Sequence, residues 1–274
     1  MANNSADEMI RHYTAADEAS RLRAGWFQLE QARTQELILR HLQPAPAKVL
    51  DVGGAAGAYA CWLAARGYQV HLIDPVPTHI EQARAASAKL PQHPLASATV
   101  GDARQLEPAN QTADAVLLLG PIYHLTERKD RLTALREAHR VLRPGGMVWV
   151  AAISRFASLL DSLAHSFFDE PEFAPILDRD LAEGQHRNPT GNLTYFTDAF
   201  FHLPDELAAE LSEAGFELVE LVAIEGPCWL ARDFDRLWNH PQQRQRLLAS
   251  LRKVEHEPAL IGASSHILAI GRRG

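Results

Sequence analysis

Short apolar segments alternate with helical segments between residues 49 and 153, and this alternation constrains the fold more than any other feature of the chain. Residues 115–119 are apolar throughout, which is typical of a strand buried on both faces of a parallel sheet. A helical pattern over residues 58–66 ends at Gly67, a residue that favours a helix C-terminus. A repeated βα order of this kind predicts an α/β fold with a doubly wound, mostly parallel sheet. The strands predicted in this region cover residues 49–52, 68–73, 98–100, 115–119 and 147–153.

Breaks in this alternation divide the chain into four predicted parts. Residues 1–45 read as an N-terminal helical cap that ends at a proline pair. Residues 46–153 form the core, and residues 154–203, which are rich in Phe, His, Asp and Pro without a strand period, read as a lid insert. Residues 204–274 complete the core sheet and carry a second helical insert. Seven strands are predicted in all, the last two at residues 216–224 and 265–271.

The composition narrows the class of protein. Apolar residues make up 46% and charged residues 22% of the chain, as in ordinary soluble globular proteins. No apolar run reaches the length of a transmembrane helix, and the N-terminus lacks the pattern of a secretory signal. Two distant cysteines suggest neither a disulfide framework nor a zinc site, and the net charge of −7 argues against general nucleic-acid binding. We therefore expect a cytoplasmic protein that handles a small molecule.

The segment 51–57, with the sequence DVGGAAG, is the most informative motif and lies between the first predicted strand and its helix. Glycines at such a turn let the backbone approach a ligand closely. Dinucleotide-binding loops have the pattern G-x-G-x-x-G, but counting from Gly53 this chain has Ala55 and Ala58 at the second and third glycine positions. Asp51 precedes the loop instead, and it would suit a cofactor that carries an ammonium and a sulfonium rather than a pyrophosphate.

Two further acids follow the next two predicted strands. Asp74 ends the second strand, where a carboxylate accepts hydrogen bonds from a ribose diol, and Asp102 follows the third strand, where it could accept from an adenine amino group. Each acid on its own could serve as a turn residue. Because ligands of such folds bind outside the carboxyl ends of the strands, the acids at three successive strand ends indicate one shared crevice.

These residues, together with the LRPGG turn at 142–146, resemble the class I S-adenosylmethionine-dependent methyltransferase family. The resemblance covers about residues 48–153 and implies a Rossmann-like sheet with S-adenosylmethionine as cofactor. Ala55 is a departure, since many members have Gly there. The resemblance also implies that the N-terminal helices fold over the cofactor. The cofactor-binding residues that it implies are Tyr13, Arg33, Asp51, Gly53, Gly54, Gly57, Asp74, Pro75, Asp102, Ala103 and Leu119.

The loop after the fourth predicted strand, GPIYHL at 120–125, stands beside the transferable methyl group in this family. We take Tyr123 and His124 as the candidate catalytic residues, with His124 as a general base because an imidazole titrates near neutrality. The alternative is that His124 caps a helix and Tyr123 is wall packing. Gly120 replaces the Asn or Asp of amino-directed relatives, which weakens an amide or nucleobase interpretation. The metal-binding acids of catechol-type members are missing here, so no metal is expected.

The lid is expected to supply the acceptor pocket, since small-ligand sites need an apolar wall with a few polar groups. Alternatively, part of its aromatic set forms the lid's own core. Four residues of the lid are further candidates for this wall, namely Phe167, Phe168, Phe196 and His202. The predicted substrate-binding residues are Tyr123, His124, Phe156, His186, Tyr195, Phe200 and Trp229.

The favoured function is metal-independent, direct transfer of a methyl group to an oxygen, a nitrogen or an activated carbon of a small molecule. Alignment of the reacting atoms and exclusion of water supply much of the catalysis of such a displacement. An NAD(P)-dependent oxidoreductase and a non-catalytic cofactor-binding protein are the alternatives. The expected partner is the small-molecule acceptor, without nucleic acid or membrane, and a homodimer is left open.

Overall fold

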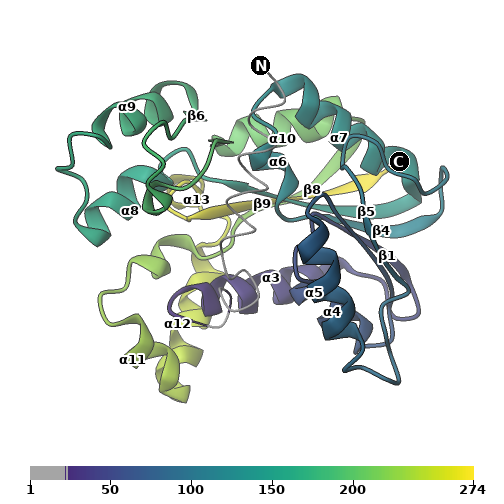
Figure 1. Ribbon diagram of the computed structural model, residues 1–274. Helices are drawn as coiled ribbons and strands as arrows, with labels where there is room; N and C mark the ends of the chain where they lie inside the picture. Colours follow the sequence, from purple (N-terminus) through teal and green to yellow (C-terminus); the bar gives the residue numbers. More distant parts are fainter. Residues whose placement is uncertain (1–21, 23) are drawn as a thin grey trace.

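The computed structural model describes residue 22 and residues 24–274, which form a seven-stranded sheet covered by helices on both faces (Figure 1). The strand order is β3-β2-β1-β4-β5-β9-β8. Every neighbouring pair from β3 to β5 is parallel, whereas β9 pairs antiparallel with both β5 and β8. The strands are β1 (Lys48–Val52), β2 (Gln69–Asp74), β3 (Ser97–Val100), β4 (Ala113–Leu118), β5 (Leu142–Ile153), β8 (Phe216–Ala223) and β9 (His266–Arg273).

The predicted α/β fold with a seven-stranded, mostly parallel sheet is confirmed. The strand boundaries differ most at the LRPGG turn, where β5 begins at Leu142 instead of Met147. Leu142 pairs with Ala113, and the register then shifts before Ala115 pairs with Met147. The glycines of this turn therefore lie within an irregular start of β5 rather than before the strand.

Alternating side chains of the strands give the sheet two buried faces. In β1, Val49 packs with helices α3, α4 and α5 on one face, whereas Leu50 packs with α7 and α10 on the other. The Trp149 indole of β5 donates to the Leu37 carbonyl at 3.2 Å and so ties α3 to the sheet. These helices are α3 (Phe27–His41), α4 (Ala58–Ala64), α5 (Pro77–Ser87), α7 (Arg128–Val141) and α10 (Pro204–Glu213).

The two inserts lie at the edge of the sheet where the parallel strands end and β9 begins (Figure 1). The insert after β5 also contains a two-stranded antiparallel sheet that its sequence did not predict. Its elements are α8 (Ala157–His165), α9 (Ala174–Glu183), β6 (Gln185–His186), the 3₁₀ helix η1 (Leu193–Tyr195) and β7 (Ala199–Phe200). The insert after β8 contains the 3₁₀ helix η2 (Gly226–Leu230), α11 (Phe234–Asn239), α12 (Pro241–Val254) and α13 (Pro258–Ile261).

The short helix α6 (Pro121–His124) follows β4 and was also not predicted. Within the described part of the chain, we find no helix that combines the length and the apolar character needed to cross a membrane.

Candidate cofactor and acceptor site

A cavity of about 1600 Å³ opens at the carboxyl ends of the parallel strands. Small-molecule pockets are typically about 300–1,000 Å³, so this cavity has room for a cofactor and a second molecule together. Its cofactor half is formed by the glycine loop and by the residues that follow β2 and β3. Its acceptor half is formed by α6, by the start of β9 and by the lid insert. We use these two names for the halves below.

Two glycines of the loop are required by close contacts. A Cβ atom on Gly53 would lie 2.5 Å from Cγ of Pro121, and Gly53 has a φ of +71°. A Cβ atom on Gly54 would lie 2.7 Å from the carboxyl carbon of Asp51. The glycines therefore let α6 and the Asp51 carboxyl pack directly against the loop backbone.

The loop is held to β2 through Asp74. Oδ2 of Asp74 accepts from the Ala55 amide at 2.9 Å, while Oδ1 accepts from the Val76 amide at 2.9 Å and lies 3.0 Å from Nδ1 of His79. Ala55 has a left-handed φ of 46°, so an alanine here adopts the backbone conformation that glycine would take more easily. Asp74 thus orders the loop in addition to lining the cavity.

Among the acids of the cavity, the surroundings of Asp51 most clearly indicate a bound ligand. It lines the cavity, is 1% exposed, and its Oδ2 has no hydrogen-bond partner among the described residues. Burial, together with the nearby Asp74 carboxylate, raises the pKa of Asp51 to about 7. A cationic group beside Asp51 would satisfy this buried oxygen and favour the ionised carboxylate, which fits a cofactor that carries an ammonium and a sulfonium.

Asp102 differs from the other two acids because it already has a cationic partner. Its carboxylate accepts from Arg104, with Nη2 at 2.6 Å and Nε at 3.0 Å, and both side chains are partly exposed. The hydrogen bonds from Arg104 lower the pKa of Asp102. Asp102 and Ala103 line the cofactor half, as do Pro75 and Leu119.

The acceptor half contains a cluster of rings around α6. The Tyr123 and His124 rings are 4.6 Å apart, and the His124 ring lies 5.8 Å from that of Phe196 in the lid. His266, the first residue of β9, completes the group at 6.4 Å from Tyr123. Aromatic residues of the lid extend the wall, namely Phe167, Phe173, Tyr195 and Phe201.

His186 also lines the cavity, but its ring serves the lid structure. Nδ1 lies 2.8 Å from Asp180 and Nε2 lies 2.6 Å from the carbonyl of Tyr195, while the ring stacks on Phe201 at 4.8 Å. With both nitrogens engaged, His186 presents an aromatic surface to the cavity rather than a proton acceptor.

Several of the sequence-predicted residues do not line the cavity. Arg33 is fully buried and forms ion pairs with Glu36, at 2.8 Å, and with Glu255 of the second insert. Gly57 precedes α4 behind the loop, and Tyr13 lies outside the described residues. The remaining three are aromatic residues that pack elsewhere, namely Phe156, Phe200 and Trp229.

Local geometry explains these three cases. Neighbouring residues of an extended chain point to opposite sides, so Phe201 lines the cavity while Phe200 packs against the Arg131 guanidinium. The guanidinium carbon of Arg131 lies 3.7 Å from the centre of the Phe200 ring. The Trp229 indole donates to the Ala263 carbonyl at 2.9 Å and packs against Trp26. Phe156 is partly exposed and lies where a side chain at position 262 would be.

Conversely, sequence reasoning missed Glu30 and His266, which both line the cavity. The rule for strand ends covers only the carboxyl ends of parallel strands. Because β9 is antiparallel, its amino end meets the same edge of the sheet, and His266 stands at that end. A rule that included the start of an antiparallel last strand would have found this residue.

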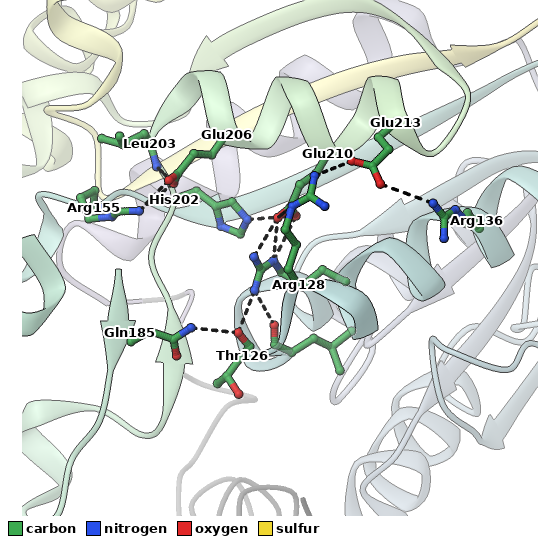
Figure 2. Close-up of polar contacts among 12 residues, drawn as sticks. Thr126, Arg128, Arg136, Arg155, Gln185, His202, Leu203, Glu206, Glu210 and Glu213 are labelled. Carbon is green, nitrogen blue, oxygen red and sulfur yellow. Dashed lines mark hydrogen bonds and ion pairs between the residues drawn. The ribbon is translucent and has the colours of Figure 1, made fainter. Parts of the chain in front are cut away.

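A buried ionic network fixes the chain segment that follows α6. Arg131 contacts Glu210 through Nη2 at 2.7 Å and through Nε at 3.0 Å. Its Nη1 donates to the carbonyls of Leu125 and Thr126, at 3.1 and 2.9 Å. Gln185 of the lid donates to the same Thr126 carbonyl at 3.2 Å (Figure 2). One arginine thus connects α7, α10 and the residues directly after His124.

Two further contacts anchor the lid to α10 (Figure 2). His202 Nε2 lies 3.4 Å from Glu210, and Arg155 contacts Glu206 at 2.7 Å. Burial on its own would raise the pKa of Glu210, but the contacts with His202 and Arg131 outweigh it and lower the pKa to about 2. Burial also lowers the pKa of His202. The carboxylate therefore stays ionised at neutral pH and holds the lid, α7 and α10 together.

Comparisons with known proteins agree with this geometry. Residues 49–146 match the family model of the methyltransferase domain. An uncharacterized methyltransferase of Mycobacterium tuberculosis is 38% identical over 112 residues, which are 39% of this chain and 42% of that protein. A ubiquinone/menaquinone biosynthesis C-methyltransferase of Rubrivivax gelatinosus is 31% identical over 175 residues, which are 62% of this chain and 63% of that protein.

Among solved structures, an S-adenosylmethionine-dependent methyltransferase of Methanosarcina mazei superposes with a TM-score of 0.58. Its sequence is 20% identical, and the match covers 86% of this chain and 96% of that one, so the likeness concerns the fold. The chain spans less than half of the length of the Mycobacterium relative. Residues 49–146 thus match a methyltransferase domain, and the fold is that of S-adenosylmethionine-dependent methyltransferases.

Proposed function

Because this chain belongs to the class I, Rossmann-like S-adenosylmethionine-dependent methyltransferases, we propose that it transfers the methyl group of this cofactor to a small molecule. The observation that carries the proposal is the continuous cavity of about 1600 Å³. It joins the buried Asp51 carboxyl, whose Oδ2 has no partner among the described residues, to the aromatic wall of the lid. A cofactor in one half and an acceptor in the other would lie in contact. The lid insert, residues 154–203, would then enclose the acceptor, and the N-terminal residues would cover the cofactor.

In this proposal the cofactor, when bound, supplies a methyl group on a positively charged sulfur. Asp51 would hold the cofactor's cationic methionine part, and Asp74 would hold the ribose. Asp102 and the Ala103 amide would hold the adenine. Tyr123 lines the cavity from α6, which packs against the glycine loop, and its ring would face the cationic centre.

We propose a direct displacement that needs no metal ion, since a sulfonium is already a good leaving group. The chain's contribution is then to align the acceptor with the methyl group and to exclude water, which together account for much of the rate in such reactions. The Arg131–Glu210 network supports this role because it fixes the segment after α6 and the lid against one helix.

An enclosed small acceptor is favoured over a macromolecule for two reasons. The acceptor half is covered by a folded insert with its own buried aromatic cluster, which leaves a space of small-molecule size. The net charge of −7 also disfavours nucleic acid. A cytoplasmic location belongs to the same proposal.

Calorimetric titration of the purified chain tests the cofactor assignment. We expect S-adenosylmethionine and S-adenosylhomocysteine to bind with micromolar dissociation constants and NADH to give no heat. Incubation with labelled S-adenosylmethionine and a panel of phenols, alcohols and amines then tests transfer. Binding without transfer to any compound of a broad panel would favour the non-catalytic alternative, and binding of NADH alone would overturn the proposal.

A further inference from the structure

A chain of buried hydrogen bonds holds the lid insert together behind the wall of the acceptor half. The Asp180 carboxyl group of α9 accepts from the Ser158 hydroxyl of α8 and lies 2.8 Å from Nδ1 of His186 in β6. Nε2 of the same ring lies 2.6 Å from the backbone carbonyl of Tyr195 in η1. Asp180 is 0% exposed and His186 is 1% exposed. We call these four residues the lid clasp, because they join α8, α9, β6 and η1.

The two contacts of the His186 ring fix the number of protons in the lid clasp. A backbone carbonyl can only accept, so Nε2 must carry a proton. A further proton must lie between Nδ1 and the Asp180 oxygen, whichever of the two atoms carries it. A neutral imidazole has one proton on its nitrogens, and an ionised carboxylate has none. The complete lid clasp therefore holds one proton more than a neutral histidine beside an ionised aspartate.

Loss of this extra proton breaks one contact of the lid clasp in either tautomer of the ring. With the remaining proton on Nε2, the lone pair of Nδ1 faces the Asp180 carboxylate. With the proton on Nδ1, the lone pair of Nε2 faces the Tyr195 carbonyl. The buried Asp180–His186 pair would also gain a net negative charge, although Oδ1 of Asp180 already has no hydrogen-bond partner among the described residues. Because an uncompensated buried charge is costly, the deprotonated lid clasp favours an opened lid.

The charged groups around the lid clasp do not compensate for this proton. The other charged residues of α9 that follow its first turn are exposed to solvent, namely Asp178, Arg179 and Glu183. The charged and titratable groups on the neighbouring elements contact one another, in the pairs Arg155–Glu206, Arg187–Asp198, Asp161–His165 and Glu170–Tyr195. Each of the two arginines thus has an acid of its own, so the charge of Asp180 depends on the proton shared with His186.

The lid clasp also positions a turn that forms part of the acceptor wall. Phe196 directly follows Tyr195, and its ring lies 5.8 Å from that of His124. Its backbone has a left-handed φ of 67°, a conformation that persists in such a residue only where the surrounding contacts hold it. Two contacts hold this turn: His186 contacts the Tyr195 carbonyl, and Nδ2 of Asn188 donates to the Phe196 carbonyl at 2.6 Å. Breaking the first contact would loosen Tyr195 and Phe196 from the wall.

We propose that the lid clasp is a proton-dependent closure of the acceptor half. With its extra proton the lid clasp holds the turn against α6 and keeps the cavity enclosed. At higher pH the proton passes to solvent, one contact of the His186 ring is lost, and the turn opens. The lid clasp controls access to the cavity whatever molecule enters it, so its action extends beyond the proposed methyl transfer.

Asp180→Asn separates the extra proton from the contacts that this proton makes. An amide nitrogen in place of Oδ2 has two hydrogens, which can be donated to the Ser158 oxygen and to Nδ1 of a neutral His186 ring. Nε2 then keeps the ring proton for the Tyr195 carbonyl. This variant should therefore keep the lid clasp closed without the extra proton, at low and at high pH alike.

Hydrogen–deuterium exchange of the full chain measures the opening of the turn. The amides of Thr194 and Tyr195 report on it, because both donate to Asn192 in the closed turn. The wild-type rate divided by the Asp180→Asn rate at the same pH is free of the intrinsic pH dependence of exchange. We expect this ratio to be near 1 at about pH 6 and to rise tenfold or more by about pH 9, since a buried group left unpaired costs at least about this factor. The ¹⁵N resonances of the His186 ring should change over the same pH range.

Asn188→Ala is the matched control, because it loosens the same turn by removing a donor that does not titrate. It should raise exchange at every pH and keep the pH-dependent rise. Calorimetric binding of S-adenosylhomocysteine should be unchanged in both variants, which excludes general misfolding. A ratio that stays flat between about pH 6 and 9, or faster exchange in Asp180→Asn than in wild type at about pH 6, would overturn the closure. Neither result would bear on methyl transfer, and a chain that bound no cofactor would overturn the proposed function without affecting this ratio.

Discussion

The cofactor half of the cavity is organised by residues that are close in sequence, and the acceptor half by residues that are far apart. The Ala55 amide and the Asp74 carboxylate that hold the glycine loop are 19 residues apart. Arg131 and Glu210, which hold the segment after α6, are 79 residues apart, and Arg155 and Glu206 of the lid are 51 apart. The two halves therefore depend on different interactions, and substitutions should affect them differently.

The halves also differ in what remains unsatisfied. Behind the acceptor half, the buried Glu210 carboxylate is paired with both Arg131 and His202. In the cofactor half Asp51 is buried with a carboxyl oxygen that has no partner among the described residues. A paired network stabilises the fold without ligand, whereas an unpaired buried carboxyl favours the ligand-bound state. We accordingly expect acceptor-half substitutions to lower stability and cofactor-half substitutions to lower affinity.

The largest expected effect is the loss of stability caused by Arg131→Met. Removing one partner of a buried ion pair leaves the other charge uncompensated, which costs about 3–5 kcal/mol. The carbonyls of Leu125 and Thr126 also lose their donor. Urea unfolding monitored by circular dichroism measures the loss. Arg136→Ala is the control, because this exposed arginine contacts the same helix through Glu213 and should change stability little. A similar small change for Arg131→Met would contradict the distinction between the halves.

The second effect is on affinity, from Asp51→Asn. We expect binding of S-adenosylmethionine to weaken about 100-fold, since a hydrogen bond to a charged group is worth about 1.5–3 kcal/mol. Isothermal calorimetry provides the measurement, and Asp102→Asn should weaken binding less because Asp102 is partly exposed and shared with Arg104. The comparison would fail if Asp51→Asn left affinity intact and lowered the free energy of unfolding instead.

The same residue gives a pH dependence whose sign can be derived. Burial and Asp74 raise the pKa of Asp51 to about 7, from an ordinary value of 3.8. The ligand-free protein thus holds a proton on Asp51 below about pH 7, and this proton must leave before a cation binds. Wild-type affinity should therefore increase as the pH rises through 7, with no such increase in Asp51→Asn. Without ligand, the raised pKa lowers stability as the pH rises from about 4 to 7.

The smallest expected effect is a difference in stability between two glycine substitutions, which separates steric contact from backbone strain. Gly53 and Gly145 both have a positive φ, of +71° and +77°, but no described atom lies within 4 Å of a Cβ built on Gly145. Gly145→Ala should cost about 1 kcal/mol for the backbone conformation alone. Gly53→Ala should cost about 1–3 kcal/mol more, because its Cβ would displace Pro121. Thermal unfolding of the two variants tests this, and equal costs would show that the contact with Pro121 is unimportant.

These differences also explain how far the sequence could predict the molecule. The core sheet was predictable because apolar strands alternate with helices, and the acids at the carboxyl ends of β1, β2 and β3 follow from the rule for strand ends. The placement of Arg33 was not predictable from the sequence, because its buried partner Glu255 lies in the second insert. The choice between Phe200 and Phe201 depended on the direction of a two-residue strand with no pattern of its own. Contacts that join distant segments leave no periodic signal in the chain.

The position of β9 has a consequence for the order of assembly during synthesis. β9 is the last strand of the sheet to be synthesised, yet it lies between β5 and β8 and pairs with both along nearly its whole length. Until residues 266–273 have left the ribosome, β5 has an unpaired edge and β8 has no neighbour in the sheet. Unpaired strand edges are prone to aggregation. A nascent chain that stalls after β8 and before β9 would expose both edges, so the synthesis of β9 is the step that closes the sheet.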